Sequence, residues 1–183
     1  SELYLLNSGN NCDIMKISLE VFSMVDLQSI KNDVFYYGAD ILSSEGMQSS
    51  RNFYQHGSIS VYEHSVSVAC VSLALSRALL IDSNERSLVR GALLHDYFLY
   101  DWHVPDKSHK FHGLTHARTA LRNAQRDFNL NKIEKDMIIR HMFPLNITPP
   151  KYRESVILCI ADKICAAFET SKCVVYKSLE FVG

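Results

Sequence analysis

Four side chains of metal-binding type stand where the surrounding sequence is apolar: His64, His95, Asp96 and Asp162. An ionised carboxylate within an apolar helix costs on the order of several kcal/mol unless a cation or several hydrogen-bond donors compensate it. Imidazole and carboxylate groups are ligands suited to divalent transition metals. A metal site explains all four positions at once. The sequence therefore predicts one or two divalent ions, with Fe, Mn, Co, Ni or Zn as candidates and Mg as a further one.

Each of these residues, taken alone, has a simpler explanation. Asp162 could pair with Lys163 or Arg153 on a partly exposed face, and a lone histidine such as His64 is more often a core residue with its hydrogen bonds satisfied. The adjacent histidine and aspartate diverge by about 100° if both are helical, so they serve one site only if other helices flank it or two ions share the carboxylate. The combination of the four residues favours the metal site.

Helices are expected to carry these side chains. The chain has seven glycines and four prolines, and no Asn-Gly or Asp-Gly turn joins alternating apolar and polar runs, so hairpin signals are nearly absent. The predicted fold is an all-α, single-domain helical bundle. Apolar spacing and end signals predict helices at about residues 14–30, 34–42, 60–81, 82–100, 116–128, 132–142 and 149–172.

Several of these helices have recognisable start signals. Asp82 and Asn131 each stand three residues before a glutamate, which is the pattern of a capping box. Thr115 can cap the helix that follows it, and Pro149 suits the first position of the last helix. The helix that contains His64 shows its apolar periodicity more clearly than its start.

Composition limits the partners of the chain. The 183 residues carry a net charge of -1, with 47% hydrophobic and 21% charged residues, and no run of Lys or Arg indicates a long nucleic acid as ligand. No stretch approaches the roughly 20 apolar residues of a membrane span, and the start lacks a signal-peptide pattern, so no membrane partner is expected. Five scattered cysteines without a C-x-x-C pair favour a reducing, cytoplasmic location.

The order of the four residues resembles the HD superfamily, whose signature is a distant His, an adjacent His-Asp pair and a distant Asp. Here it reads H64…H95-D96…D162, and the local text around it agrees: Tyr62-Glu63-His64-Ser65-Val66, Gly91-Ala92-Leu93-Leu94-His95-Asp96 and Ala161-Asp162-Lys163. The resemblance implies an HD-type helical bundle. It predicts a single HD domain over 1–183, with an N-terminal helical extension at 1–50 and an HD core at 55–170.

A subset of that superfamily adds two histidines between the HD pair and the last aspartate to hold a second metal. His116 and His141 match this pattern, and His112 is a rival for the first of them. The alternative for His141 is an exposed residue beside Arg140, and for His112 a loop residue. The resemblance thus implies six metal ligands: His64, His95, Asp96, His116, His141 and Asp162.

The resemblance also implies a phosphohydrolase that acts on a small phosphorylated substrate. Asp96 would bridge two ions that hold a hydroxide for attack on phosphorus. Asp101 or a nearby histidine would protonate the leaving oxygen. The cation for the remaining phosphate charge would come from one of four residues: Lys107, Lys110, Arg118 or Lys163. Two alternatives share the fold, a di-iron oxygenase and a non-catalytic metal- or nucleotide-binding signalling module, and formation of a homo-oligomer stays open.

Two further positions bear on the site. Tyr97-Phe98-Leu99 replaces the Ile-Gly-Lys that often follows the HD pair in the superfamily. Arg90 could orient Asp96 or Asp162, and an ordinary helix-surface pair with Glu85 or Glu154 is an equal alternative. Substrate specificity is expected from loops at 43–55 and 102–114.

Overall fold

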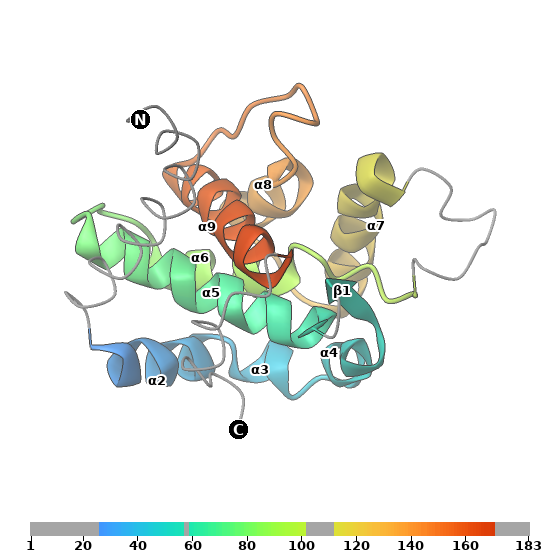
Figure 1. Ribbon diagram of the computed structural model, residues 1–183, viewed down its shortest axis with the longest axis horizontal. Helices are drawn as coiled ribbons and strands as arrows, with labels where there is room; N and C mark the ends of the chain where they lie inside the picture. The colour runs from blue at the N-terminus through green and yellow to red at the C-terminus, as the bar shows by residue number, and fades with distance from the viewer. Residues whose placement is uncertain (1–25, 57–58, 102–111, 171–183) are drawn as a thin grey trace, which may run out of the picture.

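The computed structural model describes residues 26–56, 59–101 and 112–170 and is built almost entirely of helices (Figure 1). The prediction of an all-α helical bundle is confirmed. Within the described part of the chain, no helix combines the length and the apolar character that a bilayer crossing requires. The helices are α2 (Leu27–Tyr37), α3 (Ala39–Leu42), α4 (Glu45–Ser49), the 3-10 helix η1 (Ser50–Asn52), α5 (Val61–Ala78), α6 (Glu85–Leu94), α7 (His112–Asp127), α8 (Lys132–Arg140) and α9 (Arg153–Thr170).

Helix α5 is the centre of the bundle. It packs against α6 and α9 on two sides and against α2 on a third (Figure 1). Most of its side chains are buried, which explains why apolar periodicity predicted it well. Its start has a capping box that the sequence reading did not identify, in which the Ser60 hydroxyl accepts from the Glu63 backbone N–H and the Glu63 carboxylate accepts from the Ser60 N–H.

A short antiparallel sheet precedes α5. Strand β1 (Tyr54–His56) pairs with β2 (Ile59–Ser60). Hairpin signals in the sequence were nearly absent, and this pair is too short to show the alternation that identifies strands. It turns the chain from η1 into α5 and brings Gln55 over the end of α6, where its side chain bonds Asp96.

Two predicted helix starts were wrong. Helix α6 begins at Glu85 because the side chain of Asn84, not Asp82, accepts from the Ser87 backbone N–H. Asp82 is fully exposed instead. Helix α9 begins at Arg153 rather than at a proline, since the preceding backbone is tied elsewhere: the N–H of Lys151 donates to the buried carboxylate of Asp136 at 2.9 Å.

Other boundaries differ as well. Helix α7 begins at His112, so Thr115 lies inside the first turn instead of capping it. Helix α2 runs through the break expected between residues 30 and 34, and the next helix starts after Gly38. The expected helical residues 14–25 lie outside the described part of the chain. The capping box of α8, formed by Asn131 and Glu134, is confirmed.

Helix α6 ends six residues before its predicted end at Tyr100. The imidazole Nδ1 of His95 bonds the Ala92 carbonyl oxygen at 2.7 Å, which occupies an acceptor at the end of the helix. Leu99 has φ 60°, a left-handed conformation incompatible with a continued helix. The regular helix therefore ends at Leu94, with His95 as its C-cap in helical dihedral angles (φ -60°, ψ -34°) and Asp96 in the turn that follows.

The residues after Asp96 pack into the core. Tyr97 is 2% exposed and Phe98 is 1% exposed. The Tyr97 hydroxyl donates to Asp127 at 3.1 Å, and it lies so close to Gly46 that a Cβ there would be 1.7 Å from it. The replacement of the usual Ile-Gly-Lys thus provides apolar packing beneath the site.

Arg90 has neither of its expected roles. Its guanidinium is buried and pairs with Asp40 of α3 at 2.5 Å and with Glu134 of α8 at 3.3 Å. These partners come from distant segments, so the spacing of charges along α6 could not reveal them. Arg90 ties three helices together.

Replacing Asn131 with Ala removes the side-chain cap of α8 and its hydrogen bond to Ser87. We expect the free energy of unfolding to fall by about 1–2 kcal/mol, because the cap satisfies backbone N–H groups that are otherwise unpaired. Urea denaturation measures the change. Asn129→Ala, at an exposed position two residues earlier, is the control. Equal denaturation midpoints for the two variants would contradict the role given to the cap.

Candidate metal centre

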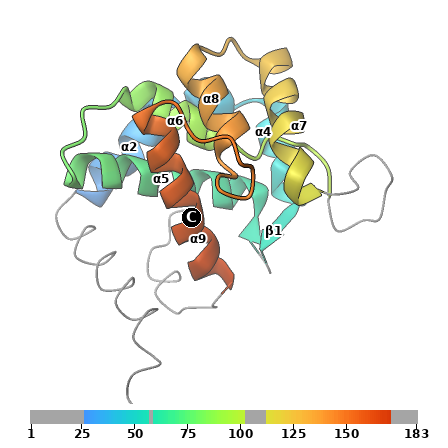
Figure 2. The same cartoon turned by 90° about the horizontal axis from the view of Figure 1, so that it is seen from above.

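Five helices deliver the predicted ligands to one region of the bundle. His64 lies in the first turn of α5 and Asp162 in the middle of α9, two helices that lie against each other in both Figure 1 and Figure 2. The other ligands lie at helix ends: His95 and Asp96 follow α6, His141 follows α8, and His116 lies in the first turns of α7. All six predicted ligands come together, although they span about a hundred residues of sequence.

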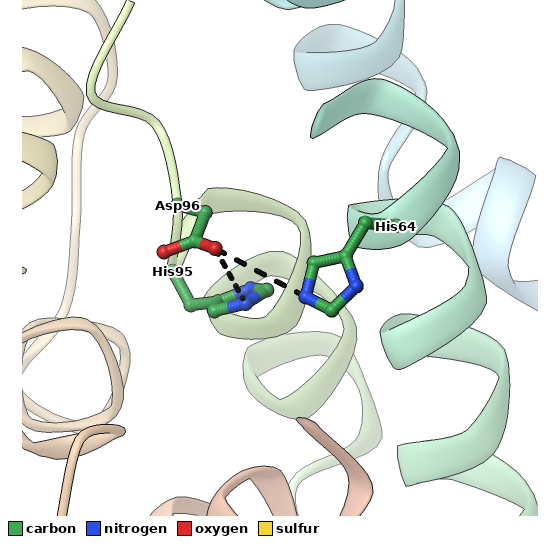
Figure 3. A group of neighbouring side chains, drawn as sticks. All are labelled: His64, His95 and Asp96. Carbon is green, nitrogen blue, oxygen red and sulfur yellow. Dashed lines mark ion pairs between the residues drawn. The ribbon is translucent and has the colours of Figure 1, made fainter. Parts of the chain in front are cut away.

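Three residues bring their ligand atoms within 4.8 Å of one another, and a fourth lies beside the two histidines among them. We call these residues the His64 cluster: His64, His95, Asp96 and Asp162. The Nε2 of His64 lies 3.2 Å from Asp162 Oδ1 and 4.0 Å from Asp96 Oδ2. The Nε2 of His95 lies 3.4 Å from Asp96 Oδ2 and 3.7 Å from Asp162 Oδ1. Figure 3 shows both imidazoles turned toward the same carboxylate oxygen. The end of helix α6 thus contributes two ligand atoms to this cluster, and α5 and α9 contribute one each.

The remaining two histidines form a second group with the same aspartate, which we call the His141 cluster: Asp96, His116 and His141. Asp96 Oδ1 lies 3.3 Å from His116 Nε2 and 3.5 Å from His141 Nε2. The two Nε2 atoms are 2.8 Å apart. Asp96 therefore directs one carboxylate oxygen to each cluster, which is the arrangement of a bridging carboxylate.

Hydrogen bonds at the far side of the rings fix which nitrogen faces the clusters. Nδ1 of His95 donates to the Ala92 carbonyl at 2.7 Å, and Nδ1 of His141 donates to the Ile138 carbonyl at 2.8 Å. A carbonyl oxygen can only accept, so the proton of each neutral ring is on Nδ1 and the lone pair is on Nε2. Both rings are thereby prepared as Nε2 ligands.

The pKa values of His64 and His141 shift in opposite directions in the two clusters. Burial opposes a charged imidazolium at His64, but Asp162 and Glu169 outweigh it and raise the pKa of His64 to about 10. Burial, opposed by Asp96 and assisted by the neighbouring His95 and His116, lowers the pKa of His141 to about 4. Without a cation, His64 therefore holds a second proton that a metal ion must displace, which links metal binding to proton release.

Both aspartates are held in the ionised form. Burial alone would raise the pKa of Asp96, but His95, His116 and His141 lower it well below its usual range. Burial likewise opposes ionisation of Asp162, and the neighbouring imidazoles of His64 and His95 lower its pKa strongly. The site thus gathers two carboxylates and four imidazoles in a region with little access to water.

The geometry fits divalent ions. Ligand atoms about 2.0–2.2 Å from a common ion lie roughly 3–4 Å from one another. The distances from His64 and His95 to the two carboxylates, 3.2–4.0 Å, fall in that range. Two ligand atoms, His95 Nε2 and Asp96 Oδ1, are buried without a hydrogen-bond partner among the described residues. Buried polar atoms of this kind are rare, and bound cations are one explanation of them. The donor set is compatible with divalent metals.

The simpler explanations of Asp162 were wrong. Arg153 instead bonds the Asp82 backbone carbonyl. Lys163 is exposed, and its Nζ donates to the backbone carbonyls of Cys159 at 3.2 Å and His141 at 3.4 Å. His141 is buried rather than exposed beside Arg140, which also excludes the alternative given for it.

For the remaining predicted residues, the structure gives at most a position and an exposure. Asp101 is half-buried at the end of the segment that follows the HD pair, and Arg118 is exposed on α7. Their catalytic roles stay predictions, as does that of Lys163. Lys107 and Lys110 lie outside the described residues, and so does the side chain of His112.

Sequence reasoning missed two polar residues at the site. Gln55 donates from Nε2 to Asp96 Oδ2 at 2.5 Å. Glu169 places both carboxylate oxygens 3.0 Å from His64 Nδ1. The only sequence signal for Glu169 is its spacing of two helical turns from Asp162, which puts both on one face of α9. Gln55 had no signal, because a strand outside the helical core positions it.

Comparison with known protein families agrees with this geometry. The HD domain family model matches residues 61–167, which include all six predicted ligands and more than half of the chain. Searches of curated proteins and of solved structures found no match. The HD superfamily consists mostly of metal-dependent hydrolases. This match shows that the chain belongs to the HD domain family.

Proposed function

We propose that the protein is a metal-dependent phosphohydrolase that cleaves a small phosphorylated substrate, such as a nucleotide or another phosphoester, at two divalent ions on either side of Asp96. The observation that carries the proposal is the division of the Asp96 carboxylate: Oδ2 belongs to the His64 cluster and Oδ1 to the His141 cluster. A carboxylate between two sets of neutral nitrogen ligands suits a pair of cations better than a single one.

The charge of the ligands supports an anionic substrate. Divalent ions bound in the two clusters would activate a water molecule and stabilise charge on phosphoryl oxygens. The histidines are neutral when they act as ligands, so two such ions would exceed the combined charge of Asp96, Asp162 and Glu169. A net cationic site in a buried setting attracts a phosphate group.

Two residues of the chain are suited to complete the reaction. Lys163 holds its ammonium 3.4 Å from the carbonyl oxygen of a metal-ligand residue, His141, and its exposed side chain can turn to a phosphate oxygen. Asp101 follows the HD pair by five residues and is half-buried, which suits a proton donor for the leaving oxygen by its place in the chain. We propose these as the phosphate-binding cation and the general acid.

Metal content tests the two-ion site. We expect the wild type, saturated with Mn²⁺ or Co²⁺ and desalted, to retain about two ions per chain by elemental analysis. His141→Ala and His116→Ala should each retain about one, because they leave the His64 cluster intact. Asp96→Ala should retain the least, since both clusters lose a ligand.

His112→Ala is the matched control for these variants, because His112 is the rival of His116 in the sequence. It should retain both ions. If His112→Ala loses an ion and His116→Ala does not, the assignment of His116 is wrong. If His64→Ala and Asp162→Ala both retain the full metal content, the whole site is wrong.

Turnover separates the proposed hydrolase from its alternatives. We expect the Mn²⁺- or Co²⁺-loaded protein to release phosphate from at least one member of a panel of nucleotides and phosphoesters, and Asp96→Asn to reduce this release to background. Phosphate release and oxygen consumption are measured side by side. Oxygen consumption by an iron-loaded sample with a mixed-valent signal, without phosphate release, would identify an oxygenase. Ligand binding without turnover of any panel member would indicate a signalling module.

A general acid at Asp101 predicts dependence on the leaving group. For alkyl phosphates, Asp101→Asn should lower kcat by about 10²-fold or more, because the departing alkoxide needs a proton. For nitrophenyl phosphate the loss should be small, because nitrophenolate leaves without one. Steady-state kinetics of both substrate types measure the difference, and an equal loss for both would contradict the role.

A further inference from the structure

We propose that Glu169 is a positioning residue that acts through His64 and makes the His64 cluster the tighter of the two metal sites. The inference rests on the proposed two-metal function and assigns its loading order. The Glu169 side chain is fully buried, at 0% exposure, and both of its oxygens lie 3.0 Å from His64 Nδ1. A buried carboxylate with both oxygens on one imidazole nitrogen holds the ring in a fixed orientation.

The partner of His64 differs from those of two other ligand histidines. The Nδ1 atoms of His95 and His141 donate to backbone carbonyls three residues earlier in their own helices. His64 instead bonds a charged side chain that comes from another helix, α9. A carboxylate partner keeps the proton on Nδ1 and makes Nε2 a stronger donor to a metal than a neutral carbonyl does.

The distribution of charge favours the same cluster. Asp162 Oδ1 and Asp96 Oδ2 both face the Nε2 atoms of His64 and His95. The His141 cluster has a single carboxylate oxygen, Asp96 Oδ1, with two neutral imidazoles. Glu169 adds a third negative charge behind the first cluster. The first divalent ion should therefore bind in the His64 cluster, and the second should bind more weakly beside it.

Helix α9 supplies the ligand and its support together. Asp162 and Glu169 are seven residues apart, which corresponds to two turns of a helix and places both on the face toward α5. His64, in the first turn of α5, lies between them: Nε2 faces Asp162 and Nδ1 faces Glu169. One helix thus fixes the imidazole from both sides.

The alternative is that Glu169 only stabilises the metal-free fold by neutralising a protonated His64. The two roles differ in their effect on metal affinity. A structural role predicts a lower melting temperature with unchanged affinity for the first ion. A positioning role predicts weaker binding of the first ion with little change in binding of the second.

The test is a calorimetric titration of the metal-free full chain with Mn²⁺. For Glu169→Gln, which keeps the size of the side chain, we expect the first ion to bind about 10–100-fold more weakly than in the wild type. The second binding event should change little. A repeat in a His116→Ala background, where only the His64 cluster remains complete, assigns the affected event to that cluster.

Two further variants complete the test. Glu154→Gln is the matched control, since Glu154 is a buried glutamate of the same helix that accepts from the Asn84 backbone N–H and has no contact with the clusters in the described structure. It should leave both affinities unchanged. Glu169→Asp keeps the negative charge but moves it away from His64 by the length of one methylene group. The first ion should therefore bind to this variant with intermediate affinity. If Glu169→Gln does not fold, the test rests on Glu169→Asp.

Several outcomes overturn the inference. Wild-type affinity for the first ion in Glu169→Gln, or in Glu169→Asp where the former is unfolded, rejects the positioning role while the two-metal function stands. Equal affinities of the Asp and Gln variants show that the charge is irrelevant. A wild type that binds no Mn²⁺ rejects the proposed function and the inference together.

Discussion

The structure depends on one electrostatic constraint, which is the ionised carboxylate of Asp96 at 2% exposure in the centre of a helical bundle. Removal of such a charge from water is costly unless cations or hydrogen-bond donors surround it. Four imidazoles face its two oxygens, and the amide of Gln55 donates to one of them. Imidazoles stabilise this negative charge only while they carry a proton to donate, whereas metal ions held between neutral imidazoles and the carboxylate would stabilise it directly. The arrangement of ligands follows from this need.

The helices meet this constraint by ending where ligands are required. Helix α6 stops at Leu94, and His95 follows as its C-cap with helical dihedral angles. Helix α8 stops directly before His141 in the same way, and in both cases the imidazole Nδ1 bonds a carbonyl of the last helical turn. The ligand side chain therefore occupies an acceptor at the end of its own helix. Helices α5 and α9 instead contribute His64 and Asp162 from positions within the helix, which their close packing brings together.

Much of the fold, and the residues that the fold brings together, could be predicted from the sequence. Apolar periodicity indicates burial, and a polar residue that interrupts it indicates a position with a special role. His64 and Asp162 were detectable on that ground, and the family resemblance added His116 and His141. Residues whose roles depend on tertiary partners were not detectable. Arg90 pairs with acidic residues from α3 and α8, and Glu169 near the end of α9 reads as an ordinary solvent-facing residue until α5 is packed beside it. Helix ends were also misjudged, since side chains such as Asn84 and His95 determine them through local hydrogen bonds.

The most direct test of the account is anomalous diffraction from crystals of the Mn²⁺-loaded protein. The account predicts two anomalous peaks on opposite sides of the Asp96 carboxylate. One should be coordinated by His64, His95 and Asp162, and the other by His116 and His141. A single peak coordinated by all the histidines, or peaks with Asp96 outside the coordination sphere, would contradict the central claim that this carboxylate joins two metal ions.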